Sequence, residues 1–369
     1  MRLITLSIIF SLFLIGCGDS GMSAVGAGGS GTAGTGGSRG GEVIQKLTHA
    51  YEPIFVDVGG EVSGVCQSWV LGNEEPLYVT KVRQTNDGGW HHSNWFFVPE
   101  TFYPPNPEAE GDDAPLEGTW RCRDRKFGEA AAATAGGVFF AQSTQTLEEL
   151  QEFPNGAVLE IPPRSMIVGS AHLLNVSAAP IDSAITMEIE AVPAEEVQIR
   201  LAPISFSNTS LEIPPMAESR FSMMCDLREP YDYLVGGAPD YNIYYVLAHY
   251  HEWGNYFKLS FAHEDGRRDT ILEIKNRVGE PLGKTIDPPM HNNGAMGLEV
   301  DCGYINDTDR TLVYGLGGQE MCVFLAYTDA KFKVGTEGGE NHPLGQNEDG
   351  LFLNETECGA VIAAPANQE

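Results

Sequence analysis

Apolar and polar residues alternate along much of the chain, in short runs separated by turn-forming residues. Between Ala184 and Ala191, Ile185, Met187 and Ile189 alternate with polar residues, and this period of two predicts a half-buried strand. Other short runs share strand character, and in the first of them Ile243, Tyr245 and Leu247 lie on one face. These further predicted strands cover Ile243–His249, Tyr256–Phe261, Leu298–Cys302 and Cys322–Tyr327.

Turn-forming clusters separate these runs, and helical patterns are scarce. The clusters are Asn86-Asp87-Gly88-Gly89, Pro104-Pro105-Asn106-Pro107 and Asn292-Asn293-Gly294. One or two helical turns are predicted over Gln145–Glu152. Many short strands with regular turns are typical of antiparallel sandwiches and barrels, so we predict an all-β fold.

The chain is long enough for two domains of ordinary size. The stretch Val192-Pro193-Ala194-Glu195-Glu196 interrupts one strand pattern before another begins, which predicts a boundary there. We therefore expect two consecutive antiparallel β-sandwich domains of jelly-roll type with a cleft between them. The first covers residues 42–193, the second 194–362, and a tail 363–369.

The first residues predict export. Arg2 precedes the apolar run Leu3–Ile15, which has signal-peptide length and is too short to span a bilayer comfortably. It ends in Leu14-Ile15-Gly16-Cys17, which resembles a bacterial lipobox. We expect a signal peptide over 1–17, acylation of Cys17, and a flexible Gly/Ser-rich tether over 18–41. The folded body would then be held at a bacterial membrane, the outer one, facing the periplasm or the surface. An ordinary signal peptide with an incidental cysteine is the alternative.

Charge and cysteine content restrict the function further. The chain carries 51 acidic against 22 basic residues, a net charge of −29, which excludes a nucleic-acid-binding protein because such proteins need a basic surface. Six cysteines follow Cys17, and none has C-x-x-C spacing. An even number in an exported chain predicts disulfides, although six cysteines allow 15 pairings. These cysteines are Cys66, Cys122, Cys225, Cys302, Cys322 and Cys358.

Five of the nine histidines fall into three clusters: His91 with His92, His172 alone, and His249 with His251. Residues i and i+2 of a strand project from the same face, so His249 and His251 can bind one metal ion. Adjacent histidines point to opposite faces unless the backbone bends, and Gly88 and Gly89 favour a bend before His91. From the residues alone, zinc, copper and iron all remain open, and a hydrogen-bonded structural role is the alternative for each cluster.

The order of the histidine clusters and of a later Met-Cys pair along the chain resembles that in the copper type II, ascorbate-dependent monooxygenases. This family includes peptidylglycine α-hydroxylating monooxygenase and dopamine β-monooxygenase. A His-His pair is followed by a single His, then by His249-Tyr250-His251-Glu252-Trp253-Gly254, and then by Glu320-Met321-Cys322. The resemblance covers about residues 42 to 362. It implies two copper ions, with ascorbate or another one-electron donor as reductant and O2 as co-substrate.

The resemblance also implies ligands and disulfides, residue by residue. The ligands of an electron-transfer copper would be His91, His92 and His172. The catalytic, oxygen-binding copper would be held by His249, His251 and Met321. The thioether of Met321 would favour Cu(I), whereas core packing is the commoner role of a methionine. The implied disulfides are Cys66–Cys122, Cys225–Cys358 and Cys302–Cys322.

Two departures from the family pattern bear on the substrate. The peptide-hydroxylating members hold a substrate carboxylate with an Arg and an Asn, and this chain has Leu247 and Val323 in those places. Two apolar side chains cannot provide charge-assisted hydrogen bonds to a carboxylate. The family's additional first-domain disulfides are also missing, so a looser first domain or a different loop around Glu129–Gly137 is expected. The sequence therefore predicts a monooxygenase that hydroxylates a small, non-peptide substrate. A non-catalytic copper-binding surface lipoprotein and a purely structural β-sandwich lipoprotein are the alternatives.

Overall fold

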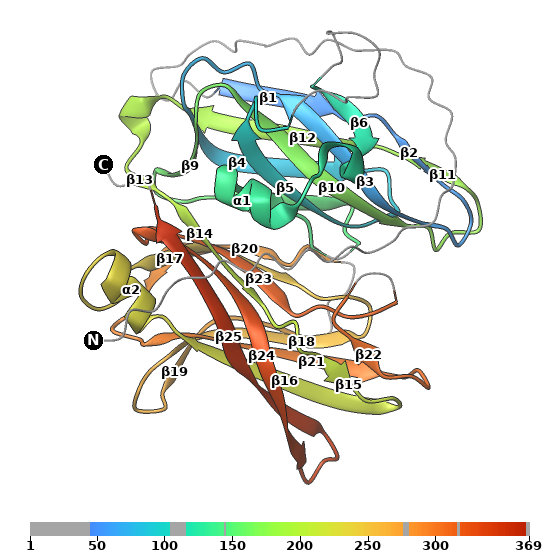
Figure 1. The fold of residues 1–369 in the computed structure, drawn as a ribbon, viewed down its shortest axis with the longest axis vertical. Helices are drawn as coiled ribbons and strands as arrows, with labels where there is room; N and C mark the ends of the chain where they lie inside the picture. Colours follow the sequence, from blue (N-terminus) through green and yellow to red (C-terminus); the bar gives the residue numbers. More distant parts are fainter. Residues whose placement is uncertain (1–44, 104–115, 144, 276–279, 316–317, 367–369) are drawn as a thin grey trace. The chain divides into compact units, whose positions relative to one another are not determined.

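The computed structural model describes residues 45–103, 116–143, 145–275, 280–315 and 318–366, and strands dominate this part of the chain (Figure 1). Several sheets form a sandwich-type architecture, which confirms the all-β prediction. The predicted signal peptide, Cys17 and the tether lie outside the described residues. No helix within those ranges is long and apolar enough to cross a membrane. The described helical segments are α1 (Glu129–Ala135), α2 (Arg228–Leu234) and the 3-10 turns η1 (Cys122–Arg125) and η2 (Ala194–Glu196).

The N-terminal half contains two main sheets. The first has the order β1-β12-β4-β9-β13, with β8 also paired to β4; its strands are β1 (Gln45–Ala50), β4 (Leu77–Asn86), β8 (Glu148–Glu152), β9 (Ala157–Ile161), β12 (Ile185–Val192) and β13 (Ile199–Arg200). The second has the order β6-β3-β10-β5-β7; its strands are β3 (Glu61–Val70), β5 (Trp90–Pro99), β6 (Gly118–Arg121), β7 (Gly137–Ala141) and β10 (Ser165–Leu174). A separate pair joins β2 (Ile54–Val56) and β11 (Ile181–Ser183).

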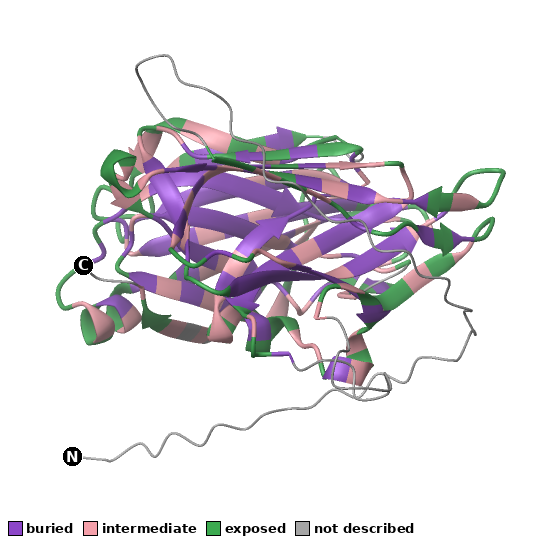
Figure 2. Ribbon diagram, turned by 90° about the horizontal axis from the view of Figure 1, so that it is seen from above, coloured by how far each residue is buried: buried purple, intermediate pink, exposed green. Residues whose placement is uncertain are grey.

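Both main sheets contribute to one hydrophobic core. Val82 and Ile189 come from the first sheet, and Trp95 and Ile167 come from the second; all four are buried. Alternate residues of each strand turn inward, so two sheets with one apolar face each pack into a sandwich. In Figure 2 buried residues fill the centres of these strands.

The C-terminal half is built on one long sheet. Its order is β19-β18-β21-β16-β25-β24-β14-β23-β17-β20. The strands are β14 (Ala202–Ser207), β16 (Ala217–Asp226), β17 (Asn242–His249), β18 (Gly254–Ala262), β19 (Arg268–Lys275), β20 (Gly283–His291), β21 (Gly297–Asn306), β23 (Val323–Thr328), β24 (Phe332–Gln346) and β25 (Phe352–Pro365). A small sheet pairs β15 (Glu212–Ile213) with β22 (Leu312–Val313). Phe257 of β18 and Val246 of β17 share one core although their strands are far apart in the sheet order, so the sheet folds over on itself.

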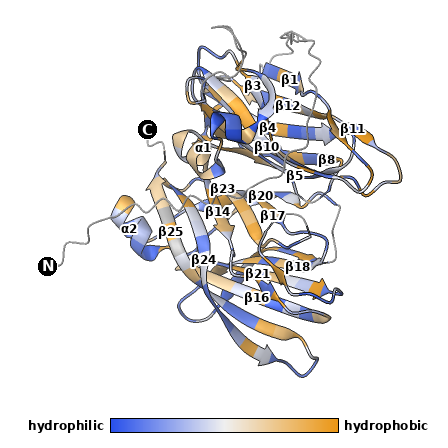
Figure 3. Ribbon diagram, turned by 45° about the vertical axis from the view of Figure 1, so that its right-hand side comes forward, coloured by the Kyte–Doolittle hydropathy of each residue, from blue (hydrophilic) through white to orange (hydrophobic). Residues whose placement is uncertain are grey.

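One face of β17 packs into the C-terminal core, and the other face packs against the N-terminal half. Tyr245 and Leu247 belong to the core of the first sandwich, whereas Val246 and Ala248 belong to that of the second. Hydrogen bonds reinforce this interface: the Tyr327 hydroxyl donates to the carbonyl of Phe139 at 3.0 Å. Figure 3 shows the apolar character of β17 and β23. Because β17 alternates between two cores, both of its faces are buried.

The predicted strands are present, and one predicted element is wrong. The runs starting at 184, 243, 256, 298 and 322 correspond to β12, β17, β18, β21 and β23. The segment 145–152 contains no helix; its second half forms β8, with Glu149 and Gln151 buried and Leu150 exposed. Polar side chains on the buried face hid the strand pattern, because apolar alternation marks a strand only when the inward side chains are apolar.

The sequence also predicted a domain boundary over 192–196, a change around 129–137, and disulfides among the six cysteines. The turn η2 lies at the boundary stretch, and β13 after it still pairs with β9, so the domain limits stay a prediction. The segment 129–137 forms α1 and the start of β7. All three disulfides implied by the resemblance are present: Cys66–Cys122, Cys225–Cys358 and Cys302–Cys322.

Candidate metal site

The first histidine group lies where β5 and β10 pair. His92 is directly opposite His172, whereas Leu173 pairs with Trp90, so His91 is an extra residue in β5. This irregularity is the bend that lets adjacent histidines turn toward one centre. Gly89 makes it possible: its φ is +75°, and a Cβ there would lie 2.3 Å from Cδ1 of Ile181.

The second group lies at the end of β17. His249 follows Leu247 on the strand face that packs against the N-terminal half, and it is opposite Val323 of β23. The chain then turns, and the Gly254 amide donates to the carbonyl of His251 at 3.1 Å. Strand alternation thus aims His249 at the first group, and the turn after β17 places the His251 ring 5.1 Å from that of His249.

The five histidines come together in a single buried cluster. Ring centroids of His91 and His251 are 4.6 Å apart, and those of His92 and His249 are 4.9 Å apart. Two sets of three have their ligand nitrogens within 4.8 Å of one another: His91, His92 and His172, and His92, His249 and His251. The histidines expected on either side of a cleft are therefore in ring contact.

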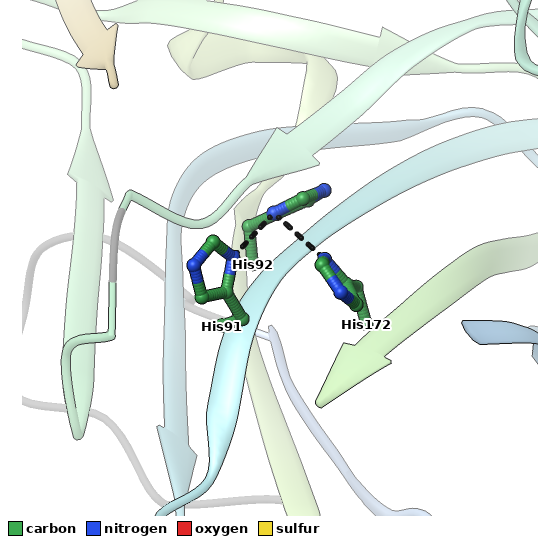
Figure 4. Close-up of side chains that lie close together, drawn as sticks. All are labelled: His91, His92 and His172. Carbon is green, nitrogen blue, oxygen red and sulfur yellow. Dashed lines mark hydrogen bonds between the residues drawn. The ribbon is translucent and has the colours of Figure 1, made fainter. Parts of the chain in front are cut away.

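Hydrogen bonds select which ring nitrogens of the first group face the centre. Nδ1 of His92 lies 3.2 Å from Nδ1 of His91 and 3.4 Å from Nδ1 of His172 (Figure 4). On the far side of the ring, Nε2 of His172 is 2.7 Å from a carboxylate oxygen of Glu61. A carboxylate accepts the N–H of Nε2, which leaves the lone pair on Nδ1 for the cluster.

The second group offers the other nitrogen. Nδ1 of His251 donates to the carbonyl oxygen of Gln319 at 2.8 Å, so its lone pair is on Nε2. Three buried ring nitrogens have no hydrogen-bond partner among the described residues: Nε2 of His251, and Nδ1 and Nε2 of His249. Buried polar atoms rarely stay unsatisfied in proteins, and a metal ion would satisfy these.

Burial keeps four of the five imidazoles neutral. Burial lowers the pKa of His91 to about 3 and that of His251 to about 4. It also lowers the pKa of His92 and His249 well below the ordinary value, and the neighbouring histidines lower both further. A neutral imidazole is the form that binds a metal ion, so these four rings can do so at pH 7.

Glu320 connects the two segments of the second group, and our sequence reasoning did not identify it. One carboxylate oxygen accepts from the amides of His251 at 2.9 Å and Met321 at 3.1 Å, and the other accepts from the Trp253 amide at 2.8 Å. The Glu320 side chain is fully buried, and burial raises its pKa to about 8. In the sequence, only its position between Gln319 and Met321 pointed to this role.

The main chain of Met321 is held beside His251. Their amide nitrogens contact the same Glu320 oxygen, and the Tyr304 hydroxyl donates to the Met321 carbonyl at 2.7 Å. Nearby, Leu247 is buried in the interface core and Val323 is half-buried. Leu247 and Val323 therefore place apolar side chains near His249, at the two positions where the resemblance would lead one to expect an Arg and an Asn.

Comparison with known proteins adds little to this all-β fold and its histidine cluster. No known family model matches the chain, and no curated protein sequence matches it. Among solved structures, PBSX exported protein XepA shows 8% identity over 76% of this chain and 86% of its own, with a TM-score of 0.18. PNGF-II shows 9% identity over 77% of this chain and 65% of its own, with a TM-score of 0.27.

Proposed function

We propose that this protein is a copper-dependent monooxygenase that hydroxylates a C–H bond of a small, non-peptide substrate, with O2 and a one-electron donor such as ascorbate. The observation that carries the proposal is the cluster of five buried histidines, with ring nitrogens directed at one another. Burial lowers the pKa of four of them, which keeps those rings neutral. A purely structural cluster would pair these nitrogens with hydrogen-bond partners, whereas three of them have none in the part of the chain that the structure describes.

The donor set fits copper. Imidazole nitrogens suit both oxidation states, and a thioether such as that of Met321 favours the reduced one. Copper bound here would supply one-electron transfer and activation of O2, and the chain would supply position and surroundings. Glu61 orients His172, and Gln319 orients His251. Glu320 holds the main chain of His251 next to that of Met321.

The surroundings favour an uncharged substrate group near His249. Leu247 and Val323 offer no hydrogen bonds from their side chains, so a substrate carboxylate would lose its hydration there without compensation. This supports the assignment of a non-peptide substrate.

The three disulfides support a location outside the cytoplasm, because disulfides persist in oxidising compartments. They are consistent with export and with lipid anchoring through Cys17. We include both in the proposal.

Copper content and oxygen uptake together test the proposal. The refolded, tag-free protein should bind two copper ions per chain and consume O2 when ascorbate is added. Copper uptake without donor-dependent oxygen consumption would instead support a non-catalytic copper-binding lipoprotein. Retention of zinc under copper excess would contradict both.

A further inference from the structure

His92 belongs to both groups of potential ligands. Its Nδ1 is 3.2 Å from Nδ1 of His91 and 3.4 Å from Nδ1 of His172. Its ring also lies across the interface from the second group, with centroids 4.9 Å from His249 and 5.6 Å from His251. No other histidine appears in both three-residue sets found among the described residues.

The second three-histidine set also contains this residue. Within it, His249 and His251 supply two imidazoles, and the third comes from the N-terminal half. The two three-histidine sets have six places for five histidines because His92 stands in both, and the thioether of Met321 would be a further ligand of the second set. The arrangement differs from two separate sites, one in each half, which the sequence resemblance implies.

We propose that His92 is a ligand common to two metal positions, so that the five histidines form one coupled centre and the two ions do not bind independently. The inference rests on the proposed function only in requiring that the cluster binds copper. It concerns this chain's own residues and does not depend on turnover.

Two ring nitrogens allow this shared role. A neutral imidazole has one lone pair and one N–H, so one ion binds to the lone pair. If a second ion bound at the other nitrogen, the N–H bond would break, the proton would go to solvent, and the freed lone pair of His92 would hold that ion. No oxidation state changes in this step. A nearby cation stabilises the deprotonated ring, just as bound metal ions lower the pKa of their other ligands.

Cu(II) titration of matched variants tests the proposal. His172→Ala removes a residue found only in the first set, and His249→Ala removes one found only in the second. Each should weaken one ion most. His92→Ala should weaken both ions by at least about tenfold, since it removes a direct ligand from each. If His92→Ala loses one ion and binds the other as tightly as the wild type does, His92 is not shared.

Electron paramagnetic resonance of the wild type gives an independent result, which also decides the question if His92→Ala fails to fold. The fully Cu(II)-loaded protein should show an exchange-coupled pair, with less integrated signal than its copper content. Two isolated signals that account for all the copper would overturn the shared role while leaving the proposed function intact. A wild-type chain that binds no Cu(II) would overturn both.

Discussion

Replacing Glu320 with alanine should destabilise the protein and disorganise the His251 segment. The carboxylate accepts three backbone amides, from His251, Trp253 and Met321, at 2.8 to 3.1 Å. Alanine supplies no acceptor. All three N–H groups would lose the acceptor that a fully buried side chain provides in the wild type.

The magnitude follows from two opposing effects. A buried N–H without an acceptor costs roughly 1 to 3 kcal/mol, so three of them cost roughly 3 to 9 kcal/mol. Removing the carboxyl also removes the cost of burying it, which is the main reason that its pKa is raised to about 8. We therefore expect a loss near the lower end, about 3 kcal/mol. Glu320→Gln keeps one acceptor oxygen and should fall between alanine and the wild type.

Urea unfolding of the metal-free protein measures this loss, and Cu(II) titration measures the effect on the site. Glu252→Ala is the matched control, because Glu252 is an exposed glutamate in the same turn. Its midpoint should match that of the wild type. If Glu320→Ala unfolds at the wild-type urea concentration and binds Cu(II) normally, the carboxylate does not organise this segment.

Three further predictions concern the disulfide, the thioether and the response to pH. Opening Cys302–Cys322, which closes a separation of 20 residues, should cost about 3 kcal/mol in denaturant unfolding, and an unchanged midpoint would contradict this. Met321→Ile should keep near-normal copper content but show weaker Cu(I) affinity and background oxygen uptake, because the soft ligand is lost; full donor-dependent uptake would place the chemistry elsewhere. Burial raises the pKa of Glu149 to about 7 and that of Glu320 to about 8, so the stability of the metal-free protein should fall between about pH 6.5 and 8.

The sign of the pH effect follows from proton binding. A carboxyl with a raised pKa binds more protons in the folded chain, so its contribution is complete below the unfolded value of 4.5 and is lost as pH rises through the folded value. Burial lowers the pKa of His91, His92, His249 and His251, and their contribution is complete above 6.5. Glu149→Gln should therefore flatten the decline above pH 6.5. An equally steep decline in this variant would show that Glu149 does not titrate there.

Local patterns in the sequence were sufficient for much of the fold. Alternation in 184–191 predicted β12, and the apolar run before His249 predicted β17 and the face on which the histidine lies. Strand alternation depends only on near neighbours, so it can be recognised without the rest of the chain. Strand alternation did not identify β8, because its inward residues Glu149 and Gln151 are polar. These side chains can be buried because their hydrogen-bond partners come from other segments of the chain. The Gly283 amide donates to Glu149, and the Gln151 side-chain amide donates to the Phe139 carbonyl.

By itself, the sequence determined the histidine clusters, the strand that ends at His249 and sets the side on which it lies, and the turn before His91. Only the tertiary structure decided that His92 contacts His249 across the interface, and that Glu320 joins the amides of His251 and Met321. The physical reason is that these contacts depend on which buried faces pack together. Such packing is set by the shapes of whole sheets, so local sequence patterns do not specify which distant residues meet.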